Sequence, residues 1–220
     1  MDELAGYDFE QVTFENLAGS DLVVNTIYQS GSAPNLKSEV LSRLLPVGNV
    51  GGFRWPGTWD KTNLVVLTSN ANESLWPDKY DRERKMVRYF GDKRSDGDIL
   101  ETRGGNRILE AAFRGVEGGA NGRLGVPVFL YFGRWGKGRD WLFNGLAVPG
   151  HPEVDASVSL QKVWSDSENG TFANYLATFT VIKVPRVSRI WIQELLLGQK
   201  LSENTPLAYR KWVENGDFLT

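Results

Sequence analysis

Two neighbouring segments of this 220-residue chain hold aromatic, acidic and glycine residues in polar surroundings. The first contains Trp76 and Asp78 in a W-P-D triplet, and the second contains Tyr89 followed by Gly91 and Asp92. Flat side chains stack on planar rings, a carboxyl oxygen accepts from an exocyclic amine, and glycine permits close approach. These residue types match a pocket for a nucleobase turned out of its duplex, an arrangement that lets a protein inspect a single base.

Asp78 is the stronger of the two acidic candidates for accepting from the amine. Pro77 restricts the backbone and would hold Trp76 and Asp78 in a fixed relation, whereas Asp92 directly precedes two basic residues that can neutralise it. We therefore expect Asp78 to contact the amine and Trp76 and Tyr89 to provide stacking faces. Stacking of a base on an aromatic side chain contributes about 1–3 kcal/mol.

Residues for catalysis are few. The chain has no cysteine, which excludes thiolate nucleophiles, disulfides and zinc fingers, and its one histidine, His151, is predicted to lie in an exposed turn. There is no GxxxxGK[ST] phosphate loop. Asp78, Asp98 and Glu101 resemble the acidic residues of a magnesium-dependent nuclease, but Arg103 stands where such sites have lysine. A self-contained nuclease remains an alternative hypothesis.

The distribution of charge favours a polyanionic partner. The net charge is −2, from 25 basic and 27 acidic residues. Residues 79–140 hold 14 Lys or Arg and 9 Asp or Glu, so this middle region is basic while the remainder is acidic. A basic face beside an acidic remainder is typical of a DNA-binding module, although a mixed, solvated surface would look similar.

The hydrophobic pattern predicts an α+β fold in which a curved or barrel-like sheet is flanked by helices. Strands are predicted at 22–28, 63–68, 85–90, 127–132, 141–148 and 172–184, and helices at 35–45, 106–113, 187–197 and 206–213. Glycine-rich loops are predicted at 46–56 and 115–125. We expect a single domain over 1–220, with 1–8 flexible and 187–220 forming closing helices. No apolar run approaches the roughly 20 residues that span a bilayer, so a soluble, cytoplasmic protein is expected.

Three stretches carry a resemblance to a known family. They read LVVLTSNANESLWPDKYD (64–81), VRYFGDKRSDGDILETRGGNRILEAAF (87–113) and RDWLFNGLAVPG (139–150). They resemble the N-terminal domain of AspBHI-like modification-dependent restriction endonucleases, whose pattern includes W-P-D, Y-[YF]-G-D-[NK] and R-G-G-N. That domain is in turn similar to the SET- and RING-associated (SRA) readers of modified cytosine. Where the SRA family has Y-D-G, this chain has Phe143, Asn144 and Gly145.

The resemblance implies an SRA-like (PUA-like) fold and a non-enzymatic module without cofactor or metal. Its partner would be double-stranded DNA carrying 5-methylcytosine or a related modified cytosine, recognised by base flipping. The endonuclease domain would then lie elsewhere in the parent protein. A protein-binding or small-ligand module on the same fold remains a further alternative. The preferred modification, the flanking sequence and the oligomeric state stay open.

The predicted site has three parts. The residues expected to form the modified-base pocket are Trp76, Asp78, Tyr89, Phe90, Gly91 and Asp92. The residues expected to contact the DNA backbone are Lys93, Arg94, Arg103, Arg107, Arg134 and Lys137. The candidate wedge, which would fill the gap left by the flipped base, is Arg54 or Trp55 in the glycine-rich loop 46–56.

Overall fold

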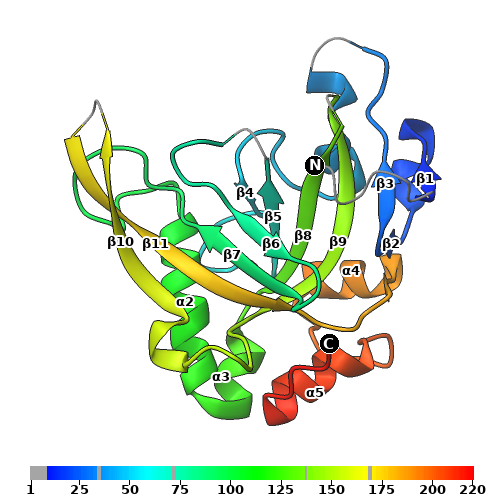
Figure 1. The fold of residues 1–220 in the computed structure, drawn as a ribbon. Coiled ribbons are helices and arrows are strands. Elements are labelled where there is room, and N and C mark those ends of the chain that lie inside the picture. Colours follow the sequence, from blue (N-terminus) through cyan, green and yellow to red (C-terminus); the bar gives the residue numbers. More distant parts are fainter. Residues whose placement is uncertain (1–8, 34–35, 71–72, 137, 168–169) are drawn as a thin grey trace.

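A strongly curved mixed sheet organises the chain (Figure 1). The computed structural model describes residues 9–33, 36–70, 73–136, 138–167 and 170–220. The strands are β1 (Gln11–Val12), β2 (Leu22–Val23), β3 (Thr26–Tyr28), β4 (Phe53–Arg54), β5 (Leu64–Ser69), β6 (Lys79–Asp81), β7 (Met86–Phe90), β8 (Val128–Trp135), β9 (Asp140–Pro149), β10 (Leu160–Ser167), β11 (Gly170–Val181) and β12 (Arg186–Val187).

The main sheet follows the order β4-β5-β8-β9-β11-β7-β6, with β10 paired to β11, and with β3 paired to both β9 and β1. β5 and β8 are parallel, whereas the pairs β8–β9, β9–β11 and β11–β7 are antiparallel. The curvature brings the β7–β6 end of this path close to the β4-β5-β8 end, and the Phe53 ring on β4 packs edge-on against that of Tyr89 on β7. The ring of Tyr80 on β6 packs edge-on against that of Tyr131 on β8, 5.5 Å between centroids. The sheet is therefore barrel-like, and β4–β5 and β7 meet at a seam.

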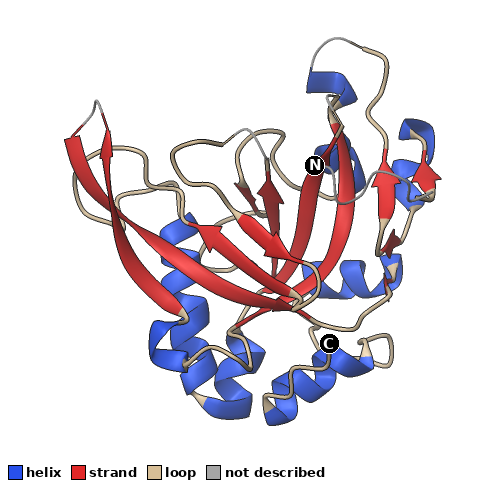
Figure 2. Ribbon diagram, in the orientation of Figure 1, coloured by secondary structure: helices blue, strands red, loops and turns tan. Residues whose placement is uncertain are grey.

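Helices cover one side of the sheet, as Figure 2 shows for α2, α3 and α5. The α-helices are α1 (Val40–Leu44), α2 (Gly105–Glu117), α3 (Gly119–Gly125), α4 (Arg189–Leu196) and α5 (Leu207–Asn215). Short 3-10 helices occupy Phe14–Gly19, Leu36–Ser38 and Ala156–Val158. Among the described helices, none combines the length and apolar character needed to cross a bilayer.

The core lies between the curved sheet and these helices. The apolar strand residues 64–67 of β5 are fully buried, as expected for a strand covered on both faces. From the helical side, Trp191 of α4 and Trp212 of α5 are both buried. The Ser188 hydroxyl accepts a hydrogen bond from the Trp191 N–H and caps the start of α4. The two closing helices predicted from the apolar spacing in 187–220 are thus present.

The predicted fold class is confirmed, but several predicted elements are corrected. Residues 115–125, predicted as a loop, are helical, because α2 runs on to Glu117 and α3 follows at once. Glycine has poor helix propensity, yet it lets the α2–α3 hairpin close tightly. The predicted strand 22–28 is divided at Asn25, whose φ is 64°. The predicted loop 46–56 contains β4, and β10 was not predicted.

Gly122 is the position where the α2–α3 hairpin depends on glycine. A Cβ atom at this residue would lie 2.1 Å from the carbonyl oxygen of Gly115. Gly122→Ala is therefore expected to lower the free energy of unfolding by about 1–3 kcal/mol, because the two helices must separate. Gly125→Ala is the matched control, since a Cβ there meets no atom within 4 Å. Urea unfolding that gives equal stability for the two variants would contradict this assignment.

His151 is buried, which corrects the predicted exposed turn. It is 4% exposed, its Nε2 lies 2.9 Å from the carbonyl oxygen of Arg84, and its Nδ1 accepts from the N–H of Glu153. Both ring nitrogens are occupied by backbone groups of two turns. His151 is therefore explained as a structural residue that joins these turns.

Candidate functional site

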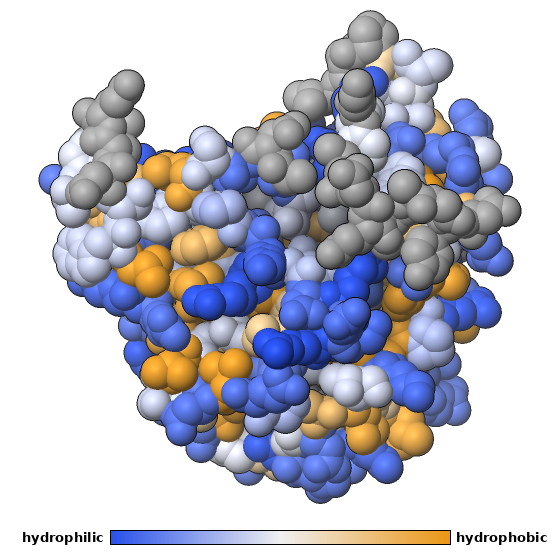
Figure 3. Space-filling model, in the orientation of Figure 1, coloured by the Kyte–Doolittle hydropathy of each residue, from blue (hydrophilic) through white to orange (hydrophobic). Residues whose placement is uncertain are grey.

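A pocket of about 950 Å³ lies at the seam between β4–β5 and β7. Its walls come from residues 49–55, 89–95 and 101–103, and from Thr68, Asn70, Glu73, Trp76, Asp78, Arg134 and Trp141. In Figure 1 these segments lie between the projecting β10–β11 hairpin and the projecting ends of β8 and β9. Figure 3 shows that the outline of the molecule dips between these two regions. The segments predicted to hold the base-binding residues thus line one cavity.

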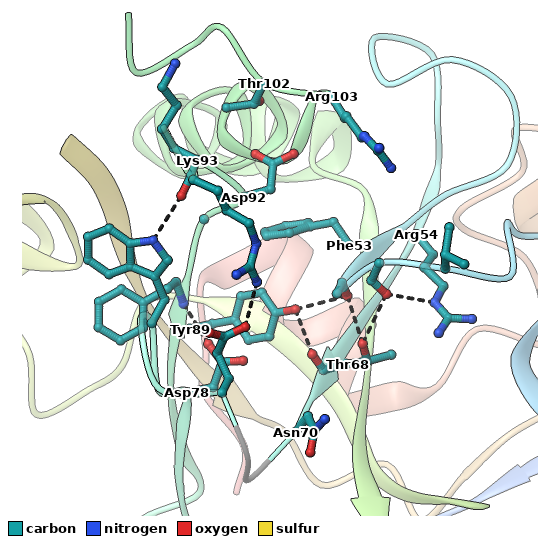
Figure 4. A pocket seen from close by; sticks show the side chains of 18 of the residues that line it. Phe53, Arg54, Thr68, Asn70, Asp78, Tyr89, Asp92, Lys93, Thr102 and Arg103 are labelled. Atoms are coloured by element: carbon teal, nitrogen blue, oxygen red, sulfur yellow. Dashed lines mark hydrogen bonds and ion pairs between the residues drawn. The ribbon is translucent and has the colours of Figure 1, made fainter. Parts of the chain in front are cut away.

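Tyr89 lies deep in the pocket and closes the seam. Its hydroxyl is 3.0 Å from the carbonyl oxygens of both Gly52 and Thr68, and its ring packs edge-on against Phe53 at 5.1 Å (Figure 4). The side chain is 2% exposed, and burial raises the pKa of its hydroxyl well above the usual value. Tyr89 therefore joins β7 to β4 and β5 and fixes the shape of the pocket.

Trp76 fixes one predicted segment against the other. Its indole N–H donates to the carbonyl oxygen of Lys93 at 2.9 Å, and its ring packs against Phe90 with 5.2 Å between centroids and 32° between planes. Trp76 is 5% exposed, whereas Phe90 is only partly buried. Of this aromatic pair, Phe90 thus has the greater accessible surface within the pocket lining.

Asp78 presents a carboxyl group to the pocket while its position is fixed by the backbone. Its Oδ1 accepts the N–H of Phe90 at 2.9 Å. Burial is the main cause that raises the pKa of Asp78, to about 8. The hydrogen bond from the Phe90 N–H and the charge of the Arg94 guanidinium lower this pKa, whereas the Glu73 carboxylate raises it further. At neutral pH the carboxyl is therefore mainly protonated, so it can donate from one oxygen and accept on the other.

Asp92 lines the same pocket, but its carboxylate is engaged by helix α2. Its two oxygens accept the N–H groups of Gly105 and Asn106, each at 3.0 Å, which is a favourable arrangement at a helix N-terminus. The preceding Gly91 must be glycine, because a Cβ there would lie 1.7 Å from Oδ1 of Asn106. These two residues set the direction of α2, and Asp78 remains the better placed acid for a ligand.

The predicted backbone-contacting residues separate into two groups. Lys93 is 3% exposed, its Nζ donates to the carbonyl oxygen of Glu101, and in Figure 4 it extends away from Tyr89. The Arg107 Nε donates to the carbonyl oxygen of Leu100, and its guanidinium covers the Trp59 ring. In this structure both side chains thus bind protein groups, and their predicted contacts with the DNA backbone stay predictions.

Three arginines of the predicted set line the pocket. Arg103 is exposed, and Arg94 is 62% exposed and paired with Glu73 at 2.6 Å. Arg134 is partly buried, with its guanidinium 4.0 Å from the centre of the Trp141 ring; burial, followed by repulsion from Arg54, lowers its pKa. Lys137 lies outside the described residues. These three arginines thus lie around the cavity.

Of the two candidate wedge residues, Arg54 is buried and Trp55 is partly buried. Arg54 is 6% exposed, and its guanidinium pairs with Glu39 at 2.8 Å and donates to the carbonyl oxygens of Gly48 and Gly51. Insertion of Arg54 into DNA would require this buried ion pair to break, and the predicted wedge role stays a prediction. Trp55 is partly buried beside Gly104, where an added Cβ would come within 3.0 Å of its ring.

Several lining residues were not predicted, among them Phe53, Thr68, Glu73 and Trp141. The glycine-rich stretch 46–56 was recognised as a special loop, but nothing in the sequence pointed to Glu73. Of the acids in the alternative nuclease hypothesis, Asp98 is exposed, and its Oδ1 accepts the N–H of Leu100. In the described part of the chain, no group of three or more His, Cys, Asp or Glu residues is arranged to hold a metal ion.

Comparison with known proteins identifies close structural relatives. The DNA recognition domain of the cytosine modification-dependent restriction endonuclease LpnPI is 32% identical, with a TM-score of 0.86 over 96% of each chain. The DNA modification-dependent restriction endonuclease AspBHI is 34% identical, with a TM-score of 0.87 over 95% of this chain and 97% of that chain.

A more distant neighbour is the MspJI restriction endonuclease in complex with a 27-mer oligonucleotide. It is 21% identical, with a TM-score of 0.66 over 88% of this chain and 51% of that chain, and shows the shared fold alone. Among curated proteins, none matches this sequence. The family model "Restriction endonuclease AspBHI N-terminal" matches residues 22–219. The predicted SRA-like fold is therefore confirmed, and the chain belongs to the family of AspBHI-type restriction endonuclease N-terminal domains.

Proposed function

We propose that this chain is a DNA recognition module that binds double-stranded DNA and takes a flipped, modified cytosine into the pocket at the β4–β5/β7 seam. The observation that carries the proposal is the Asp78 carboxyl, which lines the cavity with one oxygen held by the Phe90 N–H. In its protonated state this group matches the edge of cytosine, where an amine donor lies beside the N3 acceptor.

The surrounding residues supply the other requirements of base extrusion. Extrusion costs a few kcal/mol, which stacking and hydrogen bonds to the base edge must offset. The partly buried rings of Phe53 and Phe90 line the cavity beside Tyr89 and Trp76. Arg94, Arg103 and Arg134 lie around the same cavity and can contact the phosphates that flank the flipped nucleotide.

The direct test is a binding panel of matched duplexes that differ only in the modification of one cytosine. We expect tighter binding when that cytosine is modified. A fluorescent cytosine analogue at the target position would report unstacking, and its emission should rise on binding. Equal affinity for modified and unmodified duplexes would overturn modification readout, while unchanged emission would overturn base flipping.

The salt dependence of binding tests the cations around the cavity. Each phosphate contact adds about 0.9 to the slope of log affinity against log salt. Because Arg103 is exposed on the pocket rim and makes no ion pair with another described residue, Arg103→Gln should reduce that slope by about one. Lys211→Gln on α5, which lies on the opposite side of the sheet in Figure 1, is the control. An unchanged slope for Arg103→Gln would place this side chain away from the DNA backbone.

We further propose that this module does not itself cleave DNA and that a nuclease domain belongs to another part of the parent protein. The support is the family description, which names an N-terminal portion of a restriction endonuclease. Incubation of the chain with methylated plasmid and Mg²⁺ is expected to leave the plasmid intact. Cleavage that is lost in Asp98→Asn or Glu101→Gln would instead favour the alternative, a self-contained nuclease.

A further inference from the structure

An ion pair lies at the pocket beside the Asp78 carboxyl. Arg94 Nη2 and Glu73 Oε2 are 2.6 Å apart, and both residues line the cavity. Glu73 belongs to the segment between β5 and β6, and Arg94 belongs to the segment between β7 and α2. The pair thus joins two segments that both contribute residues to the pocket lining.

Glu73 is held in an orientation in which it pairs with Arg94. Its Oε1 accepts the N–H of Leu75 at 3.2 Å while Oε2 contacts the guanidinium. The hydrogen bond from Arg94 is the main cause that lowers the pKa of Glu73, so this carboxylate is ionised at neutral pH. The Arg94 side chain is 62% exposed and that of Glu73 is 27% exposed. The arginine therefore remains accessible to a competing anion from solvent.

The pair also acts electrostatically on the residues deeper in the pocket. Arg94 lowers the pKa of Asp78, whereas Glu73 raises it, and Tyr89 interacts with the Arg94 charge as well. The guanidinium thus lies close enough to the base-binding carboxyl to affect its ionisation. The ion pair and Asp78 therefore line the same cavity.

We infer that Glu73 is a positioning residue that holds Arg94 across the pocket in the free protein, and that a DNA phosphate replaces Glu73 as the partner of Arg94 when the nucleotide enters. This inference rests on the proposed function. A guanidinium donates to phosphate oxygens as it does to carboxylate oxygens, so a phosphate can replace the hydrogen bond that Arg94 now donates to Glu73. Glu73 would therefore act as an internal competitor of DNA and weaken binding in the wild-type chain.

Glu73→Gln tests the competition, because the amide keeps the shape of the side chain and removes its charge. Exposed ion pairs contribute little, so we expect affinity for a duplex with one 5-methylcytosine to rise about two- to fivefold. Asp96→Asn is the matched control: Asp96 is exposed in the same loop as Arg94, forms no ion pair among the described residues, and its loss removes the same charge. The gain for Glu73→Gln should exceed the gain for Asp96→Asn.

A double-mutant cycle gives the second arm of the test. In an Arg94→Ala background, Glu73→Gln should raise the affinity for DNA no more than Asp96→Asn does, because the side chain that Glu73 holds is gone. An equal gain for the two acid substitutions in the wild-type background would overturn the inference. Weaker binding by Glu73→Gln would also overturn it, because the ion pair would then be supporting the bound shape of the pocket.

The failure of this inference and the failure of the proposed function give different results. Equal affinity of the wild-type chain for methylated and unmodified duplexes overturns the proposed function, whatever Glu73 does. A wild-type preference for the methylated duplex, combined with no specific effect of Glu73→Gln, overturns the exchange of partners alone.

Discussion

Asp78→Ala is expected to lose the preference for modified cytosine and to retain most of the salt-dependent, non-specific binding to duplex DNA. The Asp78 carboxyl can pair with the amine and the N3 atom, which modified and unmodified cytosine share, so these hydrogen bonds stabilise the flipped state in which the modification is read, by about 1–3 kcal/mol. Affinity for the modified duplex should therefore fall by roughly 5- to 150-fold, and its ratio to the affinity for the unmodified duplex should approach one. The ratio is measured with matched duplexes at one fixed salt concentration.

Asp78→Asn is the informative partner of this variant. The amide presents one donor and one acceptor, as the protonated carboxyl does, and its oxygen can still accept the Phe90 N–H that Oδ1 accepts in the wild-type chain. We expect Asp78→Asn to keep most of the discrimination that Asp78→Ala loses. If Asp78→Ala discriminates as well as the wild-type chain does, Asp78 does not contact the base edge, and the pocket must read it through backbone groups.

The residue types and the family resemblance together indicated much of the pocket lining, because stacking rings and carboxyl groups in polar, glycine-rich surroundings suit a ligand site. Trp76, Asp78, Tyr89, Phe90, Gly91 and Asp92 line a single cavity. Their individual contacts could not be predicted, since these depend on partners far away in the sequence. Asp92 caps α2 from 13 residues away, which the spacing of charges does not reveal.

For the basic residues too, the sequence does not reveal which partners each side chain contacts. Sequence composition marks residues 79–140 as basic, but it does not separate exposed from buried cations. Lys93 and Arg94 are adjacent, yet one is 3% exposed and the other 62%. Arg54 lies in a glycine-rich stretch that looks mobile, and a buried ion pair with Glu39, 15 residues away, holds it in place. Burial of charge is decided by tertiary packing, which can satisfy a cation only where an acid or several carbonyl groups meet it.

The glycines of the α2–α3 hairpin show that low helix propensity can predict a loop where the chain is helical. Five glycines within residues 115–125 predict a loop, and each costs helix stability relative to alanine. Here the small residues allow the backbone of Gly122 to approach Gly115 closely, so tertiary packing outweighs the intrinsic preference. The family resemblance supplied the fold because it reflects packing that local pattern does not encode.

The stability of the folded chain is expected to depend on pH through Asp78. In the unfolded chain this carboxyl has an ordinary pKa of 3.8, whereas burial raises the folded value to about 8. Between these values the folded state binds a proton that the unfolded state has released, so the free energy of unfolding falls as pH rises. The contribution is complete below about pH 4, declines by up to about 1.4 kcal/mol per pH unit, and levels off above about pH 8. The total loss is on the order of 5 kcal/mol.

The difference in unfolding free energy between Asp78→Asn and the wild-type chain isolates this effect, because the other titrating groups cancel. Urea unfolding at a series of pH values from 4 to 9 should show that the unfolding free energy of the variant increases relative to that of the wild-type chain as pH rises. In parallel, binding of wild-type protein to a methylated duplex should weaken as pH passes through 8, because the ionised carboxyl can no longer donate to N3 of cytosine, whereas the variant should show no such step. A stability difference that stays constant from pH 4 to 9 would mean that Asp78 is ionised in the folded chain throughout, and its pairing with the cytosine edge would then need another donor.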